Sequence, residues 1–423
     1  MEHKIFARHP LGNPHRHWKQ DNFILSTFSA RGSNMRKVIA NCAGAGFTML
    51  ELGWATHEQA FEAVQLCEEY GIDLLFQDFT LHGGMQEFVS REGKLQSMVP
   101  LANTLAPWKR TVGVYIWDEP FHPDQLAEAR RQADLYEQAA PGKLPFTVAI
   151  PSYNTEYTWQ NGLFTKYLYD YAKVIDPPVL SLDYYPFGLP GYNDDDQLDT
   201  SLLWCDLGLL RKVAREYQMP LWFYYQAVNL HKYHRFTFPM VRSQMYAGAL
   251  YGAKALQEFT AVDAVITEEG ERGPIFEETK RIHAEFRALG NTLMALHSVG
   301  VYHSAELLAG SPYLTGLSDE LTGHDILPQT LPRRCSVGEL ADAYGHRYFL
   351  FLNRDVDVPL DADLPLQKPI RLYTVSRETG EQIFLGDSIT SLPLHLAAGD
   401  GVLYRMDEVT DAEPYTLEYR IEK

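Results

Sequence analysis

An alternation of short apolar runs with amphipathic stretches, from about residue 22 to about residue 300, is the feature that most constrains the fold of this chain. The runs are continuously hydrophobic, which is typical of parallel strands covered by helices. Strands are expected at Phe23–Phe28, Thr48–Trp54, Ile72–Phe79, Val112–Asp118, Pro145–Ile150, Val179–Tyr185, Leu221–Ala227 and Lys254–Phe259. Eight strand–helix repeats in roughly 280 residues predict an α/β chain with a (β/α)8 TIM barrel rather than an open sheet.

The stretches between these runs carry helix signals. Residues 56–59 (Thr-His-Glu-Gln) have the capping-box pattern, and Gly71 stands where a glycine is expected just past a helix end. After the first predicted strand, residues 28–32 lack the G-x-G-x-x-G fingerprint. This absence disfavours a dinucleotide-binding fold, and we expect no cofactor.

The pattern of apolar runs and turn residues changes beyond about residue 300. From Cys335 onward, short apolar runs are separated by Asp, Gly and Pro turns, which indicates a small antiparallel β-domain. The runs are Arg347–Leu352, Ile370–Val375, Gln382–Leu385 and Gly401–Tyr404. The expected organisation is a barrel over residues 1–300, a connection over 301–334, and a second, smaller all-β sandwich domain over 335–423.

Charge and composition narrow the classes of partner. The net charge of −18 argues against a nucleic-acid partner, because binding to phosphates needs Lys and Arg. No 18-residue apolar run occurs, so we expect no membrane partner. The N-terminus lacks an apolar signal segment, which predicts a soluble, cytoplasmic chain as it stands, or a secreted or periplasmic one if a signal was removed. The four dispersed cysteines indicate neither disulfides nor a zinc site, and a homo-oligomer is left open.

Polar residues gather where the predicted strands end, which is the edge of a barrel that carries the active site. Glu119 follows the fourth strand, directly after Asp118 and on the strand parity of Tyr115 and Trp117. Apolar neighbours and an adjacent carboxylate both raise a carboxyl pKa, and glycosidic cleavage needs one protonated carboxyl beside a second carboxylate. We therefore predict Glu119 as a catalytic acid. The alternative is a surface carboxylate at the start of the helix that Pro120 opens.

Three segments resemble those of a known group of enzymes. Asp118-Glu119-Pro120 is similar to the acid/base motif of clan A glycoside hydrolases, which include the β-galactosidases. The segment 296–304 (Leu-His-Ser-Val-Gly-Val-Tyr-His-Ser) resembles the barrel exit of that group, and 349–355 (Phe-Leu-Phe-Leu-Asn-Arg-Asp) resembles a strand of the β-sandwich that often follows. The resemblance implies a barrel glycosidase that acts on an oligosaccharide or glycoside.

The chain departs from this group at the seventh strand, where the resemblance implies a nucleophilic Glu. The residue there is Gln226, and a neutral amide does not act as a carboxylate nucleophile. Two other catalytic acids are available: Glu258 at the end of the eighth strand, which we prefer, and Asp183 at the end of the sixth. The alternatives are a helix-facing ion pair for Glu258 and a substrate hydrogen bond for Asp183.

Further residues at this edge are expected to contact a sugar. Asp118 is expected to accept a hydrogen bond from a ring hydroxyl, and His231 to donate one from the loop after strand seven. The pair His231 and His234 lacks an acidic partner at metalloprotease spacing, so we expect no metal. The remaining substrate-binding candidates are Trp54, Trp117, Tyr184, Tyr185, Tyr225 and Gln226, although a barrel core also buries such rings.

Two rival functions stay open at this point. In the first, Gln226 marks lost catalysis, and the barrel only binds a carbohydrate. In the second, the barrel belongs to another enzyme class. An aldolase needs a Lys at a strand end, whereas Lys254 begins the eighth strand, and a metal hydrolase needs several His residues where this chain has acids and aromatics.

Overall fold

The computed structural model describes residues 1–30, 32–52, 57–76, 107–153, 159–187, 202–230 and 236–422. Parallel strands form two four-stranded sheets, in the orders β2-β9-β8-β7 and β3-β4-β5-β6. Each of the predicted runs overlaps one of these strands, and β5 and β6 begin one residue before the predicted start. They are β2 (Ile24–Thr27), β3 (Met49–Leu52), β4 (Asp73–Phe76), β5 (Thr111–Trp117), β6 (Leu144–Thr147), β7 (Leu180–Asp183), β8 (Leu221–Gln226) and β9 (Ala255–Phe259).

Hydrogen bonds join the two parallel sheets at both of their free edges. On one side, the Thr48 amide, which precedes β3, donates to the Leu25 carbonyl of β2 at 2.8 Å. On the other, the Ala149 amide, which follows β6, donates to the Ser181 carbonyl of β7 at 2.9 Å, and Ala149 forms a parallel bridge with Leu182. The carboxyl ends of all these strands therefore point the same way.

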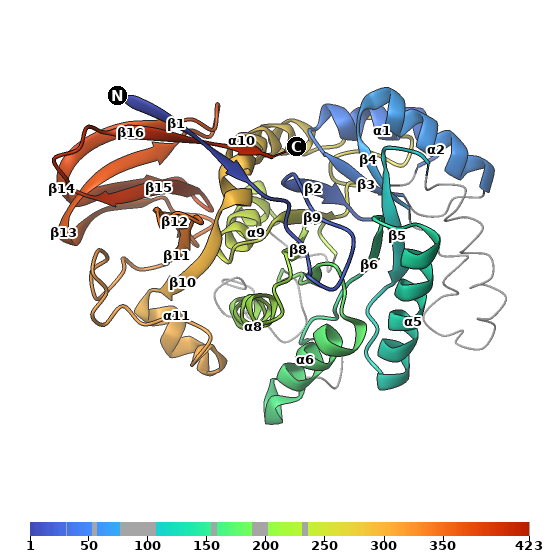
Figure 1. The fold of residues 1–423 in the computed structure, drawn as a ribbon, viewed down its shortest axis with the longest axis horizontal. Coiled ribbons are helices and arrows are strands. Elements are labelled where there is room, and N and C mark those ends of the chain that lie inside the picture. The colour runs from blue at the N-terminus through green and yellow to red at the C-terminus, as the bar shows by residue number, and fades with distance from the viewer. Residues whose placement is uncertain are drawn as a thin grey trace.

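Helices cover the outside of these sheets (Figure 1). In α6, six buried residues recur at helical spacing, which gives that helix one apolar face. The helices are α1 (Met35–Gly44), α2 (His57–Tyr70), α5 (Pro123–Ala139), α6 (Leu163–Ile175), α8 (Leu203–Glu216), α9 (Phe238–Leu250) and α10 (Phe276–Ala295).

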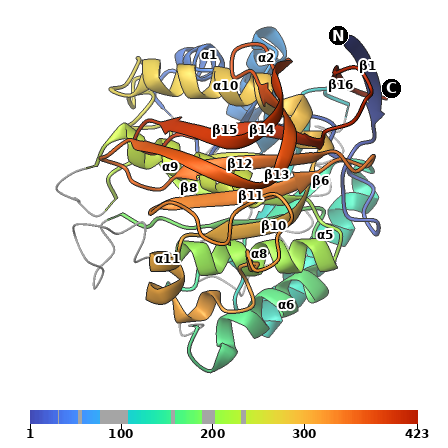
Figure 2. The same ribbon diagram turned by 90° about the vertical axis from the view of Figure 1, so that its left-hand side faces the viewer.

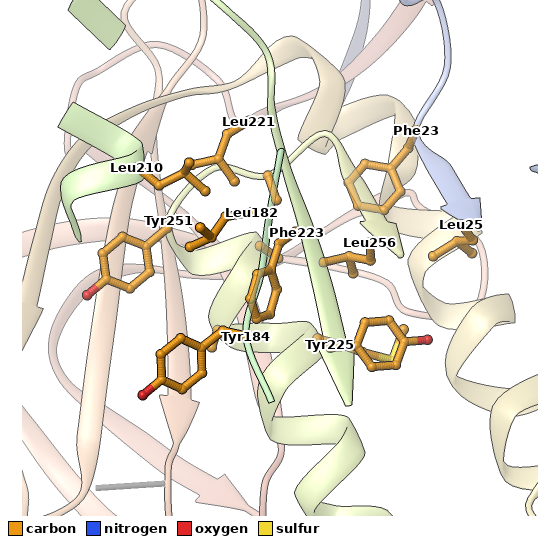
Figure 3. Close-up of a cluster of buried hydrophobic side chains, with 14 of the residues drawn as sticks. Phe23, Leu25, Leu182, Tyr184, Leu210, Leu221, Phe223, Tyr225, Tyr251 and Leu256 are labelled. Atoms are coloured by element: carbon orange, nitrogen blue, oxygen red, sulfur yellow. The ribbon is translucent and has the colours of Figure 1, made fainter. Parts of the chain in front are cut away.

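Strand alternation divides the buried residues into two sets, because successive side chains of a strand point to opposite faces. One set packs between strands and helices; we call it the helix-facing core (Figure 3). The other packs on the opposite face of the strands, between the two sheets; we call it the inner core. The helix-facing core includes Leu25, Leu182, Tyr184, Phe223, Tyr225 and Leu256. The inner core includes Met49, Leu75, Tyr115, Phe146, Trp222 and Tyr224.

A separate antiparallel sheet of six strands packs beside the helices, in the order β10-β11-β12-β15-β13-β14 (Figure 2). Its strands are β10 (His297–His303), β11 (Cys335–Ala341), β12 (Arg347–Asn353), β13 (Leu360–Val375), β14 (Gln382–Leu396) and β15 (Gly401–Glu408). The short helix α11 (Ala305–Gly310) follows β10. Near both termini, β1 (Glu2–Arg8) pairs in parallel with β16 (Tyr415–Ile421), so the first strand of the chain lies beside the last.

Among the described residues, no helix combines the length and apolar character that crossing a lipid bilayer requires.

Candidate active site at the carboxyl ends of the parallel strands

Glu51 of β3 forms the floor of the site. It is wholly buried, and its carboxylate accepts hydrogen bonds from Ser26 of β2 at 3.0 Å, from Gln257 of β9 at 2.9 Å, and from the Tyr224 hydroxyl of β8. Ser181 of β7 donates in turn to the Gln257 carbonyl oxygen at 2.9 Å. Burial raises the pKa of Glu51 to about 7, against the effect of these donors. The network ties five strands together beneath the strand ends.

Asp118 lies next to this floor, at the end of β5. The Tyr115 hydroxyl donates to its Oδ1 at 2.9 Å. Burial raises the pKa of Asp118, and the Tyr115 hydrogen bond lowers it. The charge of Asp118 is felt at Glu51 and at Asp183, where it raises both pKa values. Asp118 is thus close to the other acids and has a donor that favours its ionised form.

Glu119, the predicted acid, has an unusual backbone conformation. Its φ of 48° lies in the left-handed region, which a non-glycine residue seldom adopts and which costs of order 1–3 kcal/mol. Strained residues of this kind cluster at functional sites. The next residue is a proline, and the backbone then enters α5 through a capping box between His122 and Gln125.

The side chain of Glu119 is linked to Asp183 by a hydrogen bond. Burial raises the pKa of Asp183, the Asp118 charge raises it further, and hydrogen bonds from Glu119 and Tyr185 lower it. Within the described part of the chain, Oδ1 of Asp183 is buried and has no hydrogen-bond partner. The structure therefore brings together Glu119 of the β5 end and Asp183 of the β7 end.

Half-buried aromatic rings lie above these acids. Phe28 follows β2 and Phe259 ends β9; their ring centroids are 5.2 Å apart. Tyr185 packs on Phe259 at 4.7 Å, and Phe28 contacts the rings of Tyr115 and Tyr224 at 6.1 and 6.2 Å. An apolar rim over a carboxylate floor suits a sugar, whose ring faces are apolar and whose edges carry hydroxyls.

The expectation that Glu258 supplies the second carboxylate is corrected by the direction of its side chain. Because Gln257 points inward to Glu51, the next residue of β9 points outward, into the helix-facing core. There Glu258 accepts a hydrogen bond from Tyr225 at 2.9 Å, and Tyr225 contacts His283 of α10. Burial raises the pKa of Glu258 to about 8. Glu258 and Tyr225 are therefore on the opposite side of the strands from Glu119.

The side chains of Gln226 and Tyr184 form hydrogen bonds with backbone groups of neighbouring segments. The Gln226 amide group donates to the carbonyls of Phe187 and Val228 at 3.1 and 3.0 Å, and its oxygen accepts from the Phe187 amide at 2.9 Å. The Tyr184 hydroxyl accepts from the Leu202 amide at 2.9 Å, on the helix-facing side (Figure 3). The side chain of Gln226 thus braces a loop at the place where the resemblance implied a nucleophile.

Strict alternation along β5 predicts that the side chains of Tyr115 and Trp117 point to the same face. In the structure they point to different faces. A register shift between Tyr115 and Trp117, where β5 pairs with β6, interrupts the alternation. Trp117 packs partly buried against the helix-facing core. The predictions for Trp54 and His231 lie outside the described residues. Among the residues that are described, no cluster of His, Cys, Asp and Glu fits a metal ion.

Sequence reasoning missed several residues of this site, although a usable signal existed. Glu51, Gln257, Phe28 and Phe259 all lie within the predicted strands, but none of them was predicted to have a role in the site. In β8 both faces carry aromatic residues: Trp222 and Tyr224 on one face, Phe223 and Tyr225 on the other. The sequence alone therefore does not tell which of the two faces is the inward one. Fixing the inward face of each strand assigns Glu51, Asp183 and Gln257 to one layer.

Comparison with known proteins finds similarity in fold but none in sequence. No protein-family model matches the chain, and no curated protein sequence matches it. A solved structure described as a glycoside hydrolase aligns over 95% of this chain and 99% of its own, with a TM-score of 0.58 and 10% identity. A putative α-galactosidase of Bacteroides fragilis NCTC 9343 covers 92% of this chain and 80% of its own (TM-score 0.53, 11% identity). An Anoxybacillus α-amylase covers 92% and 99% (TM-score 0.52, 9% identity). The chain has the fold of these glycoside hydrolases.

Proposed function

We propose that this protein is a glycoside hydrolase whose catalytic domain is a (β/α)8 barrel. The barrel is supported by the hydrogen bonds that join the two parallel sheets at both edges and by the fold shared with glycoside hydrolases. The observation that carries the function is the hydrogen-bonded pair of Glu119 and Asp183, beside Asp118 and below an aromatic rim. The substrate class is an oligosaccharide or glycoside.

Glu119 is the proposed catalytic acid, and Asp183 positions its carboxyl group through a hydrogen bond. A hydrogen bond between two carboxyl groups needs one proton, so the pair carries a single shared proton over a range of pH. Burial and the Asp118 charge raise the pKa of Asp183 to about 7, so the pair keeps its shared proton up to near-neutral pH. Glu119 then gives the shared proton to the leaving oxygen as the glycosidic bond breaks, and the pair regains a proton from the water that completes hydrolysis or from solvent.

Asp118 is the proposed second carboxylate. Glycoside hydrolysis needs two carboxyl groups that flank the scissile bond, about 5–5.5 Å apart for a nucleophile and about 6.5–9.5 Å apart for a base that activates water. Glu119 and Asp183 are in direct contact, so together they form one side of the bond. Asp118, whose ionised form the Tyr115 hydrogen bond favours against the effect of burial, is the proposed group that attacks the anomeric carbon or activates water.

We propose that the all-β domain begins at β10 rather than at residue 335, because β10 pairs along β11 from His297 to His303. The sandwich-like layering is supported by the long β13–β14 hairpin. Its residues Leu364, Leu392 and Leu394 are buried with Val337 and Phe351 of the sheet in one apolar cluster, which is separate from the barrel cores.

The function is tested with a panel of aryl glycosides and oligosaccharides on wild type, Glu119→Gln, Asp183→Asn and Glu258→Gln. Glu258→Gln is the matched control, since it makes the same change in a buried glutamate on the other face of the strands. We expect loss of about 100- to 10,000-fold in kcat/KM for Glu119→Gln, a smaller loss for Asp183→Asn, and near-wild-type turnover for the control. Glycan binding without turnover by the wild type would instead favour a carbohydrate-binding barrel.

A further inference from the structure

The segment that follows β6, residues 148–153 (Val-Ala-Ile-Pro-Ser-Tyr), lies between the two halves of the acid pair. We call it the β6 extension. It bears no charged side chain and did not enter the proposed chemistry. Strand β6 pairs with β5, which leads to Glu119, and Ala149 of the extension pairs with β7, which ends at Asp183. The β6 extension therefore lies between the strand that leads to Glu119 and the strand that ends at Asp183, whose side chains are hydrogen-bonded to each other.

On the Glu119 side, one buried hydroxyl ties the β6 extension to the strained turn. Tyr167 of α6 accepts a hydrogen bond from the Ile150 amide at 2.9 Å and donates to the Pro120 carbonyl at 3.1 Å. Pro120 directly follows Glu119. The Tyr167 ring is 2% exposed and packs beside the rings of Phe164 and Tyr171, so the hydroxyl is held in place by its helix.

On the Asp183 side, the contacts run through two tyrosines and a buried acid. The Tyr185 amide donates to the Tyr153 hydroxyl at 3.1 Å, and the Tyr185 side chain is hydrogen-bonded to Asp183. The neighbour of Tyr153 is fixed from α8: the wholly buried Asp206 accepts from the Ser152 amide at 3.0 Å and from Trp159 Nε1 at 2.7 Å. Helix α8 thereby anchors the end of the extension.

We propose that the β6 extension is a spacer that sets the separation of Glu119 and Asp183, with Tyr167 and Asp206 as its positioning residues. The inference rests on the proposed function, in which this pair supplies the proton. A hydrogen bond weakens steeply when its partners move by a few tenths of an ångström, and the strained Glu119 turn has a lower-energy conformation to relax into. Removing either anchor therefore separates the pair without altering its chemistry.

The test compares Tyr167→Phe with Tyr171→Phe. Both changes remove one buried hydroxyl from the inner face of α6 and keep the ring, but the Tyr171 hydroxyl is bonded to Thr147 on β6 and not to the Glu119 turn. We expect kcat to fall by up to about 100-fold in Tyr167→Phe with KM little changed, since misplacement of about 1 Å has effects of that size. Tyr171→Phe should retain wild-type kcat.

A second readout does not depend on turnover. Isotope-edited infrared spectra across pH report the shared carboxyl proton, which Glu119→Gln assigns by removing its band. We expect that band to shift in Tyr167→Phe and in Asp206→Asn, whose side-chain NH2 group faces two donors, and to be unchanged in Tyr171→Phe. A wild type without the band would overturn the proposed function and the inference with it. A wild-type band that Tyr167→Phe leaves unchanged would overturn the inference alone.

Discussion

Strand β9 places two buried side chains of similar size in two different surroundings. Gln257 points inward and joins the network of Glu51, whereas its neighbour Glu258 points outward to Tyr225 and the helices. Both are completely inaccessible to solvent. The acid that we expected to be catalytic lies on the outer face, and the amide that received no role lies on the inner one. Because successive side chains of a strand point to opposite faces, adjacent residues lie in the candidate site and in the core between strands and helices.

The acids on the two faces also differ in what surrounds their charge. On the inner face, the charge of Asp118 raises the pKa values of Glu51 and Asp183, and each of the three acids has at least one hydrogen-bond donor. Outside, Glu258 has one donor, Tyr225, and its Oε1 has no hydrogen-bond partner among the described residues. Burial therefore dominates the pKa of Glu258. A raised carboxyl pKa accompanies both situations and does not by itself identify an active site.

The largest effect is expected at the inner face, for Asp118→Asn. An amide there keeps the hydrogen bond from Tyr115 but supplies neither a nucleophile nor a base. We expect kcat to fall by at least about 1,000-fold, with substrate binding retained. Steady-state kinetics on the best aryl glycoside, together with binding calorimetry, measures both quantities. Turnover within tenfold of wild type would remove Asp118 from the mechanism.

A smaller effect is expected for Glu51→Gln, on the floor of the site. The Gln side chain has one acceptor oxygen for donors that now come from Ser26, Gln257 and Tyr224, so a buried donor loses its partner at a cost of about 1–3 kcal/mol. Burial and the Asp118 charge raise the pKa of Glu51 to about 7, so the wild type gains a charge at this position near pH 7 and the Gln variant does not.

We therefore expect Glu51→Gln to lose about tenfold in kcat/KM and to lack the change in the pH profile that ionisation of Glu51 causes near pH 7. Its unfolding free energy should fall as well. A pH profile that coincides with that of the wild type would show that Glu51 is a structural residue with no electrostatic influence on the reaction.

Sequence reasoning located the strands and the edge that carries the acids, because continuous apolar runs and strand-end acids are both local patterns. It also predicted Glu119 as the catalytic acid, which stays a prediction. It left the second catalytic acid open between Glu258 and Asp183, because that choice depends on which face of β9 is inward. The break in alternation at Trp117 in β5 was equally outside its reach. It also had no means of finding Tyr167, whose hydroxyl joins segments 17 and 47 residues away in the sequence.

The smallest effect on activity, and the sharpest effect on stability, is expected for Glu258→Gln on the outer face. In the folded protein the pKa of Glu258 is raised to about 8, whereas an unfolded glutamate titrates near ~4.3. Between these values the folded state binds more protons than the unfolded state, so this group destabilises the wild type progressively as pH rises. Glutamine does not titrate, and the variant escapes that loss.

The advantage of Glu258→Gln over the wild type in unfolding free energy should therefore grow from pH 5 to pH 8, as measured by urea unfolding at several pH values. Glu339→Gln is the control: burial raises the pKa of Glu339, but hydrogen bonds from His324 and Tyr302 and the charge of Arg347 lower it overall. Its stabilising contribution is lost only as pH falls below about 4.3, so its difference from the wild type should stay constant between pH 5 and pH 8. A Glu258→Gln difference that is equally constant would mean that the outer carboxyl is ionised in the folded protein. The contrast between the two faces of β9 would then be one of position alone.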